Sequence, residues 1–395
     1  MQYRKDLKSN NDLSIIGFGC MRFPKTLGII DIKNTEKLIL SAIERGINYF
    51  DTAYIYPGSE ETLGTIVQKN NVRDKIYIAT KLPIFMCSAA SDFDKLFNES
   101  LKRLKTDYID YYLIHNIGDI KAWDRLKKLG IEEWLAQKKR EGKIKHAGFS
   151  FHGMRDEFLK LLDVYDWDFC QIQYNYSDEN YQAGRTGLQA AAKKGISVII
   201  MEPLLGGKLI TGLPKKAQAE FKKAKPTSTP ASWALNWLWD QSEVSLVLSG
   251  MSSMEQLNEN IALAGNAKSN CFTEEDFSVI KKVLDAFSET YKVHCTGCNY
   301  CMPCPHGVNI PGCFAAYNQS FAHSITEGLK QYVLSTGALT ANPHRAIQCV
   351  KCGACQAHCP QNIAIINELK NASKRLETLS MRAIIAIARA FSRKG

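Results

Sequence analysis

The chain has 395 residues, of which 45% are hydrophobic, 23% charged and 10% aromatic. This length exceeds what one core usually supports, and the composition excludes disordered, collagen-like and coiled-coil proteins, so we expect a globular protein with two folding units. Because no apolar run approaches the roughly 18 residues of a membrane span and the charged N-terminal residues do not resemble a signal peptide, we expect a cytoplasmic protein with no membrane span.

The first two thirds of the chain have a repeating pattern. Between about residues 13 and 265, short apolar segments rich in Ile, Val, Tyr and Phe alternate with stretches of helical periodicity. Eight such pairs within about 250 residues match the size of a TIM barrel better than an open sheet. We therefore predict an α/β fold, with a (β/α)8 TIM barrel over residues 1–270. The expected strands are 14–19, 47–51, 76–80, 108–115, 146–150, 169–174, 197–202 and 245–249.

Polar side chains lie at or close to the ends of five consecutive predicted strands. They are Asp51, Lys81, His115, Ser150 and Gln171. Each of these residues alone could cap a strand or be a satisfied polar group of the core. Active sites of TIM barrels collect at the carboxyl ends of the strands, so five such residues in sequence predict an active site on that rim.

Several short motifs surround these strand ends. They are Gly46-Ile-Asn-Tyr-Phe-Asp-Thr-Ala-Tyr54 with Tyr56, Ala79-Thr-Lys81, Asp110-Tyr-Tyr-Leu-Ile-His115 and Gly148-Phe-Ser150. Together they resemble the aldo-keto reductase family over roughly residues 13–265. The resemblance places Asp51, Tyr56, Lys81 and His115 at the four positions of the family's catalytic tetrad, and it implies hydride transfer between a nicotinamide dinucleotide and a carbonyl or alcohol.

The same four residues suit carbonyl reduction on chemical grounds. Hydride addition puts negative charge on the carbonyl oxygen, which needs a proton donor and hydrogen bonds. A phenol with its ordinary pKa of about 10 donates poorly near neutrality, but an adjacent ammonium lowers that pKa. We therefore assign Tyr56 as the proton donor and Lys81 as the ammonium. We expect Asp51 to keep Lys81 charged, and neutral His115 to orient the substrate oxygen.

Two late loops are the best candidates for phosphate contacts. Residues 203–208 follow the seventh strand with two glycines and a lysine, and a helix after the eighth strand is expected to begin with a capping box of Ser252 and Glu255. The resemblance implies that NADPH or NADH binds here, with Glu259 and Asn260 matching the adenine-contacting pair. The full expected set is Ser150, Gln171, Met201, Pro203, Leu204, Gly206, Gly207, Lys208, Gly250, Ser252, Gln256, Glu259 and Asn260.

Some of these positions depart from the family's pattern. Met201 stands where a tyrosine often stacks on the nicotinamide, and Phe151 stands where many members have an asparagine that contacts the carboxamide. Gly250 and Gln256 stand where NADP-preferring members have Lys and Arg. The choice between NADPH and NADH therefore stays open.

The pattern changes after a predicted connecting helix at 271–290. Nine of the thirteen cysteines then fall within residues 295–359, and eight of these form two runs separated by a spacer with helix-like segments and no strand pattern. We predict a small α-helical, ferredoxin-like domain over 291–370. The cysteines scattered through the barrel are expected to be buried thiols: Cys20, Cys87, Cys170 and Cys271.

The spacing of the clustered cysteines predicts two [4Fe-4S] clusters. The second run, Cys349-x2-Cys352-x2-Cys355-x3-Cys359-Pro360, is that of bacterial ferredoxins, and the first is one residue shorter. In two-cluster ferredoxins three close thiolates bind one cluster and the fourth crosses to the other. One set is therefore Cys295, Cys298, Cys301 and Cys359, and the other is Cys349, Cys352, Cys355 and Cys304, with Cys313 as a spare candidate. Two structural zinc sites are the alternative.

The C-terminal residues carry much of the formal net charge of +10. From Lys370 onward seven Lys or Arg face one acid, Glu377, and apolar residues recur near helical spacing. This pattern predicts a basic amphipathic tail over 371–395 that docks on the protein, with an anionic membrane surface as the alternative. Because aromatic and basic residues are not interleaved on one predicted face, we expect no nucleic-acid partner.

Together these features predict an NAD(P)-dependent oxidoreductase for a small-molecule carbonyl or alcohol. The iron–sulfur clusters either relay electrons to or from a partner protein or only support the small domain. The alternative is an electron-transfer or redox-sensing protein whose barrel binds nucleotide without carbonyl turnover. The intact set of four catalytic residues argues against that alternative.

Overall fold

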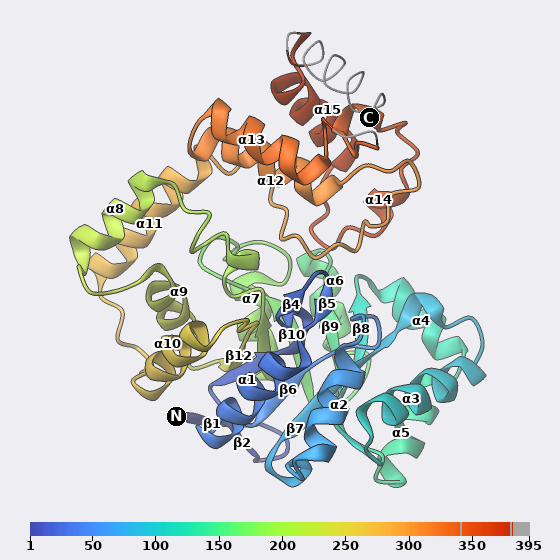
Figure 1. Cartoon of the computed structure of the whole chain (residues 1–395). Helices are drawn as coiled ribbons and strands as arrows, with labels where there is room; N and C mark the ends of the chain where they lie inside the picture. Colours follow the sequence, from blue (N-terminus) through green and yellow to red (C-terminus); the bar gives the residue numbers. More distant parts are fainter. Residues whose placement is uncertain (340–341, 380, 382–395) are drawn as a thin grey trace. The chain divides into compact units, whose positions relative to one another are not determined.

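The structure is a computed structural model that describes residues 1–339, 342–379 and 381 (Figure 1). The chain forms two compact units. The first, called the barrel unit, consists of Met1–Pro203 and Ala234–Phe272, and the second, called the C-terminal unit, consists of Leu204–Trp233 and the residues from Thr273 onward. In the described part of the chain no helix has the length and apolar character needed to cross a membrane.

The barrel unit contains a closed barrel of eight parallel strands in the order β3-β6-β7-β8-β9-β10-β11-β12, with β12 pairing back to β3. The predicted (β/α)8 fold is therefore confirmed. Its strands are β3 (Ile16–Gly19), β6 (Tyr49–Asp51), β7 (Tyr77–Pro83), β8 (Ile109–Ile117), β9 (Ile144–Phe151), β10 (Phe169–Gln173), β11 (Ser197–Met201) and β12 (Val244–Ser249).

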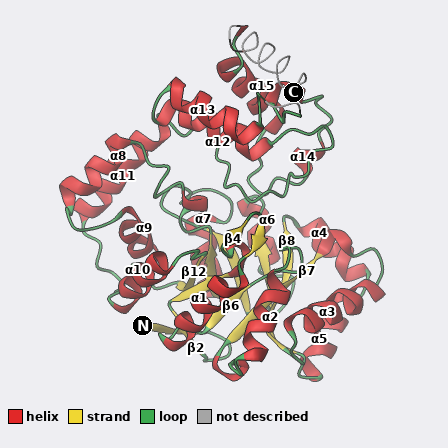
Figure 2. Ribbon diagram, viewed as in Figure 1, coloured by secondary structure: helices red, strands yellow, loops and turns green. Residues whose placement is uncertain are grey.

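Helices surround the barrel strands (Figure 2). They are α1 (Ile32–Glu44), α2 (Ser59–Lys69), α3 (Ser91–Leu104), α4 (Ile120–Lys128), α5 (Ile131–Arg140), α6 (Arg155–Leu161), α7 (Gly184–Lys193), α9 (Pro230–Trp239) and α10 (Met254–Gly265). Two hairpins were not predicted: β1 (Tyr3–Lys5) with β2 (Asp12–Ser14), and β4 (Lys25–Thr26) with β5 (Ile29–Ile30). Their strands are only two or three residues long, too short for an alternating pattern to stand out.

A buried apolar cluster of the barrel gathers residues from several strands. It includes Tyr49, Ala79, Leu113 and Phe169, all buried. Side chains two positions apart along a strand point to the same face. The residues two positions further on therefore share the side of this apolar cluster, and they are polar: Asp51, Lys81, His115 and Gln171. The strand period thus stacks a polar layer on an apolar one.

The C-terminal unit is helical among its described residues. Its helices are α8 (Lys215–Ala224), α11 (Glu274–Ser288), α12 (Ile310–Ala322), α13 (Ile325–Thr336), α14 (Ala354–Ala357) and α15 (Ile365–Leu376). The core of this unit brings together Val308, Phe314, Tyr332 and Leu369, all buried. Short 3-10 turns complete the fold at Cys20–Arg22, Arg73–Lys75, Ile84–Met86, Leu205–Gly207 and Ala346–Gln348.

Three expectations differ from the structure. Residues Leu204–Trp233, placed in the barrel from the sequence, belong to the C-terminal unit, because α8 packs on α11 and Lys225 forms an ion pair of 2.6 Å with Asp276. Cys271 is exposed, because it lies in the loop before α11, where its amide donates to Asp240. Residues 371–376 of the predicted tail belong to α15, whereas residue 380 and residues 382–395 lie outside the described residues.

Candidate active site

The ends of β6 and β7 hold a buried ion pair. Lys81 Nζ lies 2.6 Å from Asp51 Oδ1 and donates a second hydrogen bond of 2.6 Å to the Thr52 carbonyl oxygen. Lys81 is 1% exposed and Asp51 is 4% exposed. The two strands are neighbours, with Asp51 in register with Ala79, so pairing in the sheet brings these side chains together.

Tyr56 and His115 complete the group. Lys81 Nζ lies 5.2 Å from the centroid of the half-buried Tyr56 ring. The Tyr56 and His115 rings are 6.2 Å apart between centroids and nearly perpendicular, at 85°. Tyr56 comes from the loop between β6 and α2, and His115 from β8. The structure thus brings the four expected catalytic residues together from three neighbouring strands and the loop that follows one of them.

Burial sets the protonation of this group. It raises the pKa of the Asp51 carboxyl, and the Lys81 ammonium acts in the opposite direction. His115 is 5% exposed, and burial together with the nearby Lys81 charge holds the pKa of its imidazole well below the ordinary value. His115 is therefore neutral at neutral pH, and the ring nitrogen that carries the proton can donate a hydrogen bond to a substrate oxygen.

Several supporting residues could not be found from sequence motifs. Thr52 supplies Lys81 with a backbone carbonyl, and the Thr52 hydroxyl lies 2.8 Å from that of Ser59, which donates to the Cys20 carbonyl. These bonds fix both ends of the segment that carries Tyr56. His152, whose Nδ1 lies 3.1 Å from Gln182 Oε1, contributes to the lowered pKa of His115. These contacts join distant segments, so no local signal marks them.

Ser150 and Gln171 lie side by side on β9 and β10, as expected of residues on one rim. Each already has a partner. The Asn116 amide donates to Ser150 Oγ at 2.8 Å, and Gln171 hydrogen-bonds to Asp51, which favours the ionised carboxylate. Ser150 and Gln171, which the sequence analysis assigned to the cofactor, therefore also form hydrogen bonds within the rim of the barrel.

The expected nucleotide residues fall in different parts of the chain. Met201, half-buried at the end of β11, and buried Pro203 belong to the barrel unit. The C-terminal unit contains Leu204, Gly206, Gly207 and Lys208. Gly206 and Gly207 have φ values of 64° and 88°, in the left-handed region that favours glycine.

The start of α10 is shifted by one residue from the predicted capping box. Ser253, not Ser252, caps the helix and accepts a hydrogen bond from the Gln256 amide, because Ser253 is the residue with extended backbone angles. Gln256 Oε1 accepts from the Ser252 amide at 2.9 Å. Asn260 is buried and donates to Ser249 Oγ at 3.0 Å, and Glu259 is half-buried.

Arg22 was not singled out from the sequence as a site residue. Its guanidinium forms an ion pair of 3.5 Å with Glu202, and its side chain adjoins the exposed Gly250. Both contacts join segments far apart in sequence. Arg22 therefore places a cation beside the loop that follows β12.

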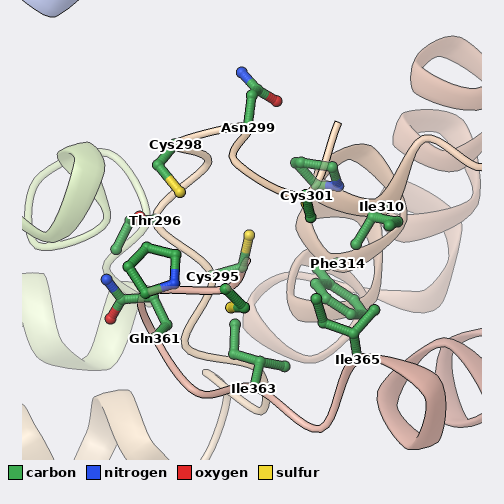
Figure 3. Close-up of a pocket in the computed structure, with 13 residues that line it drawn as sticks. Cys295, Thr296, Cys298, Asn299, Cys301, Ile310, Phe314, Gln361, Ile363 and Ile365 are labelled. Atoms are coloured by element: carbon green, nitrogen blue, oxygen red, sulfur yellow. The ribbon is translucent and has the colours of Figure 1, made fainter. Parts of the chain in front are cut away.

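The eight clustered cysteines form two groups within the C-terminal unit. Cys295, Cys298, Cys301 and Cys359 line one cavity (Figure 3). A second cavity is lined by Cys304, Cys349, Cys352 and Cys355. In each group one cysteine comes from the other run of the sequence. Cys313 lies in neither group, because it is buried in the apolar core and its thiol faces the His344 carbonyl oxygen.

The first cavity is largely apolar. Ile310, Phe314, Ile363 and Ile365 surround the cysteines, as Figure 3 shows. Burial raises the pKa of the Cys295 thiol to about 11, an effect that the nearby Lys208 charge opposes. Across the described ranges, no three His, Cys, Asp or Glu side chains converge as ligands of a single metal ion would. Four cysteine side chains around an apolar cavity fit a four-iron cluster, in which each thiolate binds a different iron.

Comparisons with known proteins find a family match for each part of the chain. Residues 15–285 match the aldo/keto reductase family, and residues 294–364 match the 4Fe-4S dicluster domain. An uncharacterized oxidoreductase of Bacillus subtilis, YqkF, is 28% identical over 339 residues, which cover 74% of this chain and 99% of that protein. The resemblance expected from the sequence, for both parts of the chain, is confirmed.

Solved structures give the same result for the barrel. The holo form of the aldo-keto reductase AKR11C1 from Bacillus halodurans is 25% identical, with a TM-score of 0.59 over 72% of this chain and 96% of its own. An aldo-keto reductase from Klebsiella pneumoniae, solved in complex with NADPH, has the same fold at 21% identity, with a TM-score of 0.59 over 72% of this chain and 95% of its own.

Proposed function

The chain belongs to the aldo/keto reductase family, and from this premise we propose that it transfers a hydride between NADPH or NADH and a small carbonyl or alcohol. The observation that carries the proposal is the buried Lys81–Asp51 pair of 2.6 Å, whose ammonium faces the Tyr56 ring beside a neutral His115. An ammonium held this way stabilises a phenolate on the adjacent tyrosine.

Each residue then has a chemical role. In reduction, Tyr56 donates its phenolic proton to the substrate oxygen while Lys81 stabilises the phenolate that remains. Asp51 keeps the buried ammonium charged and fixes its direction. Neutral His115 hydrogen-bonds the same oxygen and orients the carbonyl, and in alcohol oxidation these proton movements reverse. The bound nicotinamide supplies or accepts the hydride.

The residues present fit a dinucleotide. A side chain at Gly207 would meet no atom within 4 Å, so open space lies beside this left-handed loop, and the next residue is the cation Lys208. In the barrel unit, Arg22 provides a cation beside the β12 loop. As expected from the sequence, we assign nucleotide contacts to Ser150, Gln171, Met201, Pro203, Leu204, Gly206, Gly207, Lys208, Gly250, Ser252, Gln256, Glu259 and Asn260.

We further propose two [4Fe-4S] clusters, one on each group of four cysteines. The clusters supply one-electron redox chemistry when bound. Thiolate ligands from both runs of the sequence tie residues 295–304 to residues 349–359, so the clusters also hold the C-terminal unit together. We favour electron relay over a purely structural role, because one cluster would suffice as a staple.

The test is Tyr56→Phe in anaerobically purified, iron-loaded protein. We expect the variant to keep its nucleotide binding, which is measured by the quenching of nucleotide fluorescence. Turnover of a panel of aldehydes and ketones with NADPH and with NADH should fall by at least about a hundredfold. Unchanged turnover in the variant would remove the mechanism. A wild-type protein that binds nucleotide but reduces no carbonyl would instead favour an electron-transfer or redox-sensing role.

A further inference from the structure

The two groups of cysteines differ in how far the chain covers them. Around the first group, Thr296 and Gln361 are 3% and 6% exposed. At the second group Cys352 is itself exposed, and the neighbouring apolar residues Val350 and Ile347 are 57% and 40% exposed. The second group therefore lies near the surface of the C-terminal unit, with exposed apolar side chains beside it.

Basic residues flank this exposed region. Lys351 lies between Cys349 and Cys352 in the sequence and is exposed. Lys370 and Lys374 are exposed positions of α15. Of the residues that the structure describes, no carboxylate forms an ion pair with these three lysines.

Helix α15 carries Lys370 and Lys374 and also contacts the second group. Its residues Ile366 and Leu369 line the second cavity. Residues 342–379 contain two acids, of which Glu368 is half-buried and Glu377 is buried and paired with Arg345. Every exposed charged residue from 342 to 379 is therefore a lysine.

We propose that Lys351 and Lys370, with the exposed Ile347 and Val350, form the docking surface for a small acidic one-electron carrier protein. This proposal rests on the part of the proposed function that assigns a [4Fe-4S] cluster to the second group. In each encounter the reduced carrier loses one electron and the cluster on the second group gains one; no atom is transferred. With an oxidised carrier the electron moves the other way.

The positive charge of the surface favours an acidic carrier over a second copy of this chain as the binding partner. Opposite charges steer two proteins together and speed their encounter, and exposed apolar side chains add contact area once they meet. A second copy of this chain would present the same lysines to one another, which is repulsive across a symmetric interface. An acidic carrier matches the surface in both respects.

The experiment mixes oxidised, iron-loaded full-length protein with a reduced flavodoxin, a small acidic flavoprotein, in an anaerobic stopped-flow instrument. The flavin signal follows carrier oxidation and the visible iron–sulfur absorbance follows cluster reduction. The test variant is Lys351→Glu/Lys370→Glu. The matched control is Lys37→Glu/Lys102→Glu, which reverses two exposed lysines on α1 and α3 of the barrel unit.

We expect the test variant to lower the second-order rate constant at low ionic strength at least tenfold and to flatten its salt dependence, with the control near wild type. Reduction by photoexcited deazaflavin, a small reductant without a docking surface, should be equal in all three proteins. Equal rates with flavodoxin would overturn the proposal, as would a wild-type dimer that dissociates in the test variant. Carbonyl turnover with NADPH, measured in parallel, tests the barrel separately.

Discussion

The buried pair of Asp51 and Lys81 gives the sharpest test of how burial shapes this site. Replacing Asp51 by Asn removes the only carboxylate paired with the Lys81 ammonium, which is 1% exposed, and leaves it with neutral acceptors such as the Thr52 carbonyl. At 2.6 Å and an effective dielectric constant of about 20, the lost attraction is about 6 kcal/mol. Because the cost of burying both charges offsets part of it, we expect Asp51→Asn to lower the free energy of unfolding by about 3–5 kcal/mol.

Removing both charges should restore most of that loss. In Asp51→Asn/Lys81→Met no unpaired charge stays buried, so we expect a free energy of unfolding within about 1 kcal/mol of wild type. Turnover should nevertheless stay as low as in the single variant, because the ammonium beside Tyr56 is gone. Stability and activity should therefore separate in this pair of variants.

The assay is urea unfolding followed by tryptophan fluorescence, since all six tryptophans lie between residues 123 and 239. The matched control is Asp166→Asn, whose carboxylate lies 2.7 Å from Lys8 Nζ but is 89% exposed, and it should cost less than about 1 kcal/mol. If Asp51→Asn costs no more than this control, or the double variant is less stable than the single one, the reasoning from burial is wrong.

Three further predictions concern other parts of the chain. Burial lowers the pKa of His152 to about 4, so the unfolded chain binds more protons than the folded chain below pH 6.5. The free energy of unfolding should therefore fall by at most about 3 kcal/mol from pH 6.5 to 4. Urea titrations at each pH should show a smaller fall in His152→Asn. Cys359→Ala should roughly halve the iron content by depleting the cluster on the first group, whereas Cys313→Ala should keep full iron; the reverse would refute the grouping. Glu377→Gln leaves Arg345 without its buried carboxylate and should lower the stability of the C-terminal unit by about 3 kcal/mol. On heating, the cluster absorbance should then bleach at a lower temperature than in the wild type, and an unchanged midpoint temperature would contradict the prediction.

The barrel could be predicted from the sequence because its signals are local. Each buried strand is a short apolar run, and all eight predicted segments overlap an observed barrel strand. The strand period also carries information about the site, since Tyr49 and Asp51, or Ala79 and Lys81, must share a face wherever the strand is placed. The cysteine spacing predicted the ferredoxin-type domain in the same way, because cluster ligation imposes short, fixed intervals on the chain.

Contacts between distant segments could be decided only by the tertiary structure. Whether Leu204–Trp233 joins the barrel depends on α8 packing against α11, and whether Cys271 is buried depends on Asp240. The lowered pKa of His115 requires its burial and the nearby Lys81 charge. Neither can be recognised from the residues next to His115 in the sequence. Local sequence thus determined which chemical groups stand at the ends of the strands. Solvent exclusion and long-range packing, which depend on the whole chain, decided their protonation and their partners.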